Sequence, residues 1–144
     1  MLALVRPDSW NFPLFLHVLG SIALVGAVAA TVATAVSSQR WPWLRPIVFR
    51  TMLIVVIPAW LLMRLAGQWT DSREPIGDGS GWLDVGYIVS DAGVVFLILT
   101  TILSWIGTRR PERRWPAQAV AALAGLYLLA LLVAMFAMSG KPGS

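Results

Sequence analysis

The sequence predicts an all-α polytopic membrane protein, a bundle of four transmembrane helices. Of its 144 residues 58% are hydrophobic and only 12% are charged, whereas soluble proteins average about 25% charged residues. Four long apolar segments account for the difference, each near the roughly 20 residues that a helix needs to cross a bilayer. Because these segments and their connections fill the chain, we expect a single membrane domain over residues 1–144.

The apolar segments place the four helices at approximate positions 12–36, 46–67, 82–106 and 116–138. The first is rich in Gly and Ala, which suits close helix packing in lipid. Pro58 lies in the middle of the second and removes one backbone hydrogen bond, so a kink is expected there. The polar segment 68–81 predicts one long loop between the second and third helices.

The distribution of basic residues predicts the orientation. Seven of the eleven lie in or beside the first and third connections, and ten of the eleven are Arg, a bias that suggests a bacterial source. The positive-inside rule then places these connections in the cytoplasm and both termini outside, with the protein in the bacterial cytoplasmic membrane. Six of these seven, all except Arg50, are expected to contact lipid headgroups: Arg40, Arg45, Arg109, Arg110, Arg113 and Arg114.

Two charged residues lie within predicted helices. At about 1.5 Å per residue, Arg64 lies about 7 Å below Trp69 and Asp91 about 13 Å below Trp82. A charge at the helix centre costs about 2.5 to 3.5 kcal/mol on insertion scales, so we predict that Arg64 and Asp91 form a buried polar pair. Two alternatives remain. Arg64 extends to the headgroups while covering Trp60, or Asp91 is a protonatable group in a proton or cation path.

His17 is the only histidine and lies in the first helix. Imidazole and thioether ligands suit haem iron or copper, so haem b or copper could be held by His17 with Met63 and Met138, or with Met135 and Met138. The alternative is a packed imidazole that makes one hydrogen bond.

A short motif pattern resembles known membrane families. Residues 16–20 read Leu-His-Val-Leu-Gly, Gly67 closes the second predicted helix, and Trp82-Leu83 opens the third. This pattern is similar to small four-helix bacterial membrane proteins and to the related copper-resistance D-type membrane domains. The resemblance implies a helical bundle with its histidine in the outer half of the first helix.

Two functional hypotheses follow. The chain has no cysteine and no recognisable catalytic constellation, which argues against an enzyme. Nucleic acid is not an expected partner, because lipid headgroups explain the Arg cluster. The first hypothesis is a non-catalytic subunit or assembly factor of a membrane complex, with the bilayer and other membrane subunits or a homo-oligomer as partners. The second is a small redox, metal-handling or proton or cation-transport protein that uses His17, Asp91 and the methionines.

Overall fold

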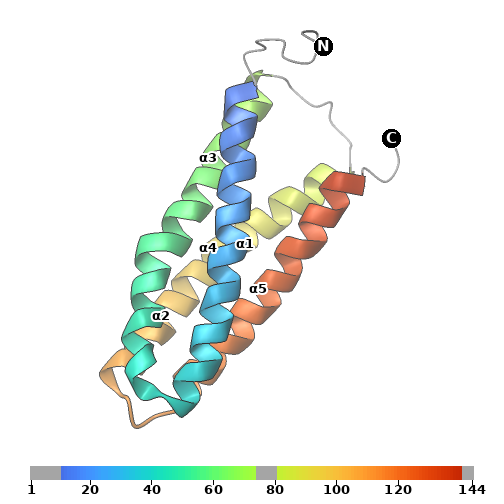
Figure 1. Ribbon diagram of the computed structural model, residues 1–144. Coiled ribbons are helices and arrows are strands. Elements are labelled where there is room, and N and C mark those ends of the chain that lie inside the picture. Colours follow the sequence, from blue (N-terminus) through green and yellow to red (C-terminus); the bar gives the residue numbers. More distant parts are fainter. Residues whose placement is uncertain (1–10, 74–80, 141–144) are drawn as a thin grey trace.

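The computed structural model describes residues 11–73 and 81–140, which are almost entirely helical and contain no strand (Figure 1). The protein is an all-α four-helix bundle, and each of its four long helical segments is long and apolar enough to cross a membrane. Their elements are α1 (Asn11–Arg40), η2 (Pro42–Leu44), α2 (Arg45–Thr51), η3 (Met52–Val56), α3 (Ile57–Arg73), α4 (Gly81–Arg109) and α5 (Trp115–Gly140).

The helices extend beyond their predicted limits. The prediction of a loop over 68–81 was wrong for its first part, because α3 continues to Arg73. An edge-on contact between the rings of Trp69 and Phe12, whose centroids are 6.1 Å apart, packs this extension against the start of α1. Polar residues can continue a helix above the apolar segment, since the helix satisfies its own backbone groups. The remaining residues, 74–80, lie outside the described part of the chain.

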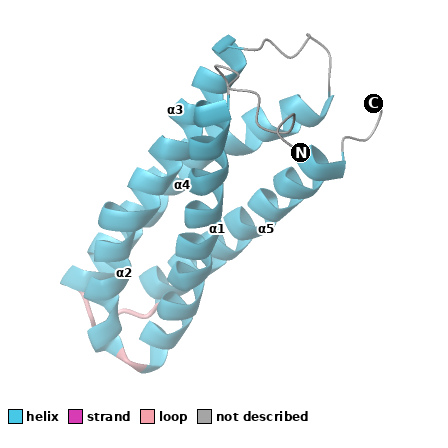
Figure 2. Cartoon of the chain, turned by 45° about the horizontal axis from the view of Figure 1, so that its top comes forward, coloured by secondary structure: helices cyan, strands magenta, loops and turns pink. Residues whose placement is uncertain are grey.

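The helices form a ring in which each packs on its neighbours. α1 lies beside α3 and α5, while α4 packs against α5 and α2. Both short connections, 41–44 and 110–114, are at one end of the bundle, here called the connection end (Figure 2). The start of α1 and the end of α5 are at the opposite end, where the α1/α3 and α4/α5 pairs spread apart (Figure 1).

Small residues serve close packing at particular positions. A Cβ atom added to Gly20 would lie 2.6 Å from the backbone nitrogen of Met63, so the α1 and α3 backbones are in direct contact there. Gly26 has nothing within 4 Å of the same added atom. Gly20 is therefore required for close packing of α1 on α3, whereas Gly26 is not.

The irregularity expected at Pro58 lies just before that residue. Residues Met52–Val56 (η3) wind as a π-helix, with Ile57 between them and Pro58. A π-helical turn is wider than an α-helical one and interrupts the regular backbone ladder. This places the interruption within the turn where Pro58 supplies no amide hydrogen.

Candidate functional site

The predicted Arg64 and Asp91 partners meet across α3 and α4. Arg64 Nη2 donates a hydrogen bond to Asp91 Oδ1 over 2.9 Å. The guanidinium carbon also lies 5.3 Å from the centroid of the Tyr87 ring, and the Tyr87 hydroxyl donates to Asp71 Oδ2 over 3.3 Å. Arg64 therefore contacts two α4 side chains, and these contacts form a polar seam from Arg64 and Asp91 to Tyr87 and Asp71.

The expectation that this pair is buried was wrong. The Asp91 side chain is 67% exposed and that of Arg64 is 21% exposed. Ile88 and Val95, three residues before and four residues after Asp91, share its face of α4, and they are 67% and 58% exposed. The carboxylate thus lies within an outward-facing apolar stripe of a membrane-spanning helix.

A second group of polar atoms lies inside the bundle near the seam. Trp60 Nε1 donates to the Ser90 carbonyl over 3.2 Å. The Tyr127 hydroxyl of α5 also lies beside Gly93. A Cβ added to Gly93 would collide with this hydroxyl and would be 2.5 Å from Trp60 Nε1. Within the described chain, Ser90 Oγ and the Tyr127 hydroxyl are buried without a hydrogen-bond partner. Sequence reasoning missed this cluster, although Trp60 is the one Trp that lies far from the ends of the predicted helices.

His17 contacts the backbone of α3. Its Nδ1 lies 2.7 Å from the Met63 carbonyl oxygen, and because a carbonyl only accepts, Nδ1 carries a hydrogen and donates it. A Cβ on Gly67 would be 2.9 Å from this Nδ1. The prediction that Gly67 closes the second helix was wrong, because α3 continues to Arg73. Gly67 lies inside α3 and makes room for the imidazole.

The candidate thioether ligands have other neighbours. Met138 extends its methyl group to Gly86 of α4, Met135 is 43% exposed, and the Met63 side chain is buried in the core. His17 makes its hydrogen bond to the backbone carbonyl of Met63 and not to the sulfur. No group of three or more His, Cys, Asp or Glu that could hold a metal occurs within residues 11–73 and 81–140.

Five of the six arginines expected at the membrane surface are exposed at the connection end, namely Arg40, Arg109, Arg110, Arg113 and Arg114. The expectation for Arg45 was wrong, because only 3% of its surface is exposed. Its Nη1 donates to the backbone carbonyls of Pro111 and, over 3.4 Å, Arg110. Arg45 therefore ties the start of α2 to the connection between α4 and α5.

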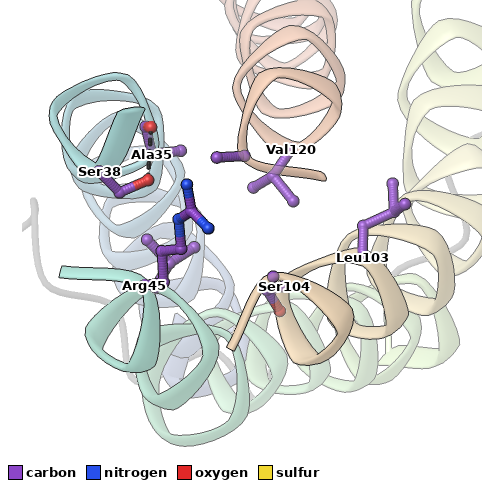
Figure 3. Close-up of a pocket in the computed structure, with 9 residues that line it drawn as sticks. Ala35, Ser38, Arg45, Leu103, Ser104 and Val120 are labelled. Carbon is purple, nitrogen blue, oxygen red and sulfur yellow. Dashed lines mark hydrogen bonds between the residues drawn. The ribbon is translucent and has the colours of Figure 1, made fainter. Parts of the chain in front are cut away.

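The Arg45 side chain enters a small cavity between the helices (Figure 3). The cavity has about 10 Å³ of space for the centre of a water molecule, which is room for one water. Arg45 Nε is buried there without a hydrogen-bond partner in the described chain. The other lining residues are Ala35, Ser38, Val48, Leu103, Ser104, Gly107, Ala117 and Val120.

The fold and these sites define a multi-pass membrane protein with four helical spans. Comparison of the chain with protein-family models, curated proteins and solved structures finds no match. The geometry of its own side chains is therefore the basis for assigning a function.

Proposed function

We propose that the protein is a non-catalytic subunit of a membrane complex, and that its partner packs on the face of α4 that carries Asp91. The observation that supports this is the exposed Arg64–Asp91 pair within an apolar stripe of a membrane-spanning helix. Ionisable side chains in membrane segments usually face a bundle interior or a water-filled cavity rather than lipid. A second membrane helix placed over the pair would provide such an interior.

Other ways to accommodate the carboxylate are less suitable. Asp91 is ten residues from the start of α4, about 15 Å along the helix, and its short side chain cannot reach the headgroups as Lys or Arg can. Arg64 neutralises it but provides one hydrogen bond, to Oδ1. We therefore expect the partner to be a transmembrane helix of another subunit that offers a hydrogen-bond donor at this depth.

Photo-crosslinking in native membranes tests the proposal. A photoreactive residue at Ile88 on the Asp91 face should capture another membrane protein, and Asp91→Leu should reduce the yield. The control position is Leu126 on α5, which is 65% exposed and so matches the 67% of Ile88. Equal capture from both positions would contradict a specific face. If the only protein captured is a second copy of this chain, the protein is a homo-oligomer and not a subunit of a mixed complex.

A second candidate is a metal- or haem-handling role, in which His17 would be a ligand. One observation favours it. His17 donates from Nδ1 to a backbone carbonyl, an arrangement that orients the Nε2 lone pair of many metal-binding histidines. If this proposal holds, the purified protein should show a haem absorption band or stoichiometric copper. His17→Asn should abolish the signal, since the Asn amide can replace Nδ1 as a donor but offers no ring nitrogen.

A further inference from the structure

The Arg45 guanidinium at the connection end is buried without a compensating negative charge. Its Nη1 bonds only backbone carbonyls, and Nε has no partner. No carboxylate lies within ion-pair distance of it among residues 11–73 and 81–140. Buried charges in proteins are normally paired. Among the residues described, this side chain therefore lacks a hydrogen-bond acceptor at Nε and a counter-charge.

The described surroundings of Arg45 provide hydrogen-bond donors and no acidic side chain. None of the residues that line the cavity is acidic. Ala117 is in the first turn of α5 and Arg45 begins α2, so two helix N-termini lie at the site. The last turns of α1 and α4, which carry Ser38 and Gly107, lie there as well. The helix dipoles therefore offset one another. Ser38 and Ser104 each donate to a carbonyl of their own helix, and their hydroxyl groups can rotate to donate to an anion instead.

The size of the cavity limits what can enter. Its space for one water-sized centre admits a single oxygen atom and excludes a whole phosphate or nucleotide. The planar guanidinium group, with its fixed fork of donors, is well suited to phosphate oxygens. The cavity also lies at the end of the bundle where five further arginines are exposed, and phospholipid headgroups present phosphates at this level of a membrane.

We propose that the cavity at Arg45 binds a phosphate group, one of whose oxygen atoms enters the cavity. The oxygen takes hydrogen bonds from the guanidinium group while the rest of the phosphate stays outside. Two sources provide this chemistry, a phospholipid headgroup and free inorganic phosphate. The site is distinct from the polar seam of α3 and α4, and the proposal does not depend on the partner surface proposed above.

The test uses the full chain in detergent. It measures ligand retention by native mass spectrometry and, separately, thermal stability. The probes are phosphatidylglycerol, inorganic phosphate, and diacylglycerol, which has the same acyl chains without phosphate. Phosphatidylglycerol should be retained and should raise the melting temperature, whereas diacylglycerol should do neither. Stabilisation by inorganic phosphate to the same extent would identify free phosphate as sufficient, and no effect of it would identify the lipid as the source.

Three variants separate this site from general attraction to anionic lipid. Arg45→Gln removes the buried charge, and Arg113→Gln removes an exposed charge at the same end. Gly107→Ala adds a methyl group to a residue that lines the cavity and leaves Arg45 unchanged. The new methyl group meets only Pro116, at an ordinary 3.5 Å. Arg45→Gln and Gly107→Ala should each weaken retention about tenfold or more, as the loss of a charge-assisted hydrogen bond predicts. Arg113→Gln should have little effect.

Two results would overturn the proposal. One is equal retention of phosphatidylglycerol and diacylglycerol by the wild-type protein. The other is an unchanged affinity in Gly107→Ala together with equal losses in Arg45→Gln and Arg113→Gln, since that pattern reports only net charge. If Arg45→Gln does not fold, because it also loses its bonds to the Arg110 and Pro111 carbonyls, Gly107→Ala alone decides the outcome.

Discussion

The imidazole of His17 occupies the space that a side chain at position 67 would fill. A Cβ on Gly67 would approach His17 Nδ1 to 2.9 Å, the same atom that bonds the Met63 carbonyl. One residue on α3 thus lacks a side chain so that one on α1 can reach the α3 backbone.

Gly67→Ala should therefore be less stable than the matched variant Gly26→Ala, which adds its methyl group to open space. Both changes gain about 1 kcal/mol in helix propensity, but the first also displaces the ring and weakens a hydrogen bond that contributes about 1 kcal/mol. Thermal unfolding in detergent measures the difference. In a His17→Ala background the penalty at residue 67 should disappear, and its persistence there would show that the imidazole is not the cause.

Arg64 and Asp91 should be energetically coupled. Arg64→Leu leaves the Asp91 carboxylate without its cation within an apolar face, so the double variant with Asp91→Leu should lose less stability than the two single losses added. A coupling of about 0.5 to 3 kcal/mol is typical for residues in contact. The control is Asp84→Leu, an exposed residue in the first turn of α4, whose effect should add to that of Arg64→Leu. Additivity in both pairs would mean that the 2.9 Å contact contributes nothing.

Removing the polar atom of Trp60 and removing that of Tyr127, which both lie beside Gly93, should have different effects on stability. Trp60→Phe removes the donor to the Ser90 carbonyl and should cost about 1 kcal/mol of unfolding free energy. Tyr127→Phe removes a buried hydroxyl that has no partner in the described chain and keeps the ring stacked on Phe96, so it should be neutral or stabilising. Chemical denaturation of both variants measures this. A clear loss in Tyr127→Phe would indicate that its hydroxyl is hydrogen-bonded.

The predicted orientation can be tested with single cysteines, since the chain has none. Ser139→Cys near the end of α5 and Glu112→Cys in the connection between α4 and α5 are both at exposed positions. In intact cells an impermeant thiol reagent should label the cysteine at 139 and not the one at 112. After permeabilisation it should label both. The reverse pattern in intact cells would invert the topology.

Composition and depth were enough to predict the four spans and the Arg64–Asp91 partnership. The spans follow from apolar length alone, and the partnership follows from two opposite charges at similar depth. Their exposure did not follow, because it depends on the rotation of α4 about its own axis. That rotation is set by packing of the whole bundle and not by the local sequence.

The arginines show the same limit. In the sequence Arg45 looks like Arg40, since both lie in one basic connection. Arg45 is buried because the backbone at 110 and 111, more than sixty residues later, folds over it and accepts its hydrogen bonds. No local pattern contains that information. For Gly67 and His17 the two halves of the contact lie on different helices, so neither residue alone predicts it.

The π-helical segment η3 has a consequence for the direction of every side chain after it. One extra residue in a helical turn advances the rest of the helix by about 100°, the angle between successive residues. Arg45 and Val48 lie before this phase shift, while Trp60 and Arg64 lie after it. Removal of one residue from the segment would restore a uniform helix but turn the later side chains away from α4. The single additional residue therefore rotates the second half of this transmembrane segment relative to the first. The first half can then face the Arg45 cavity while the second half faces the polar seam.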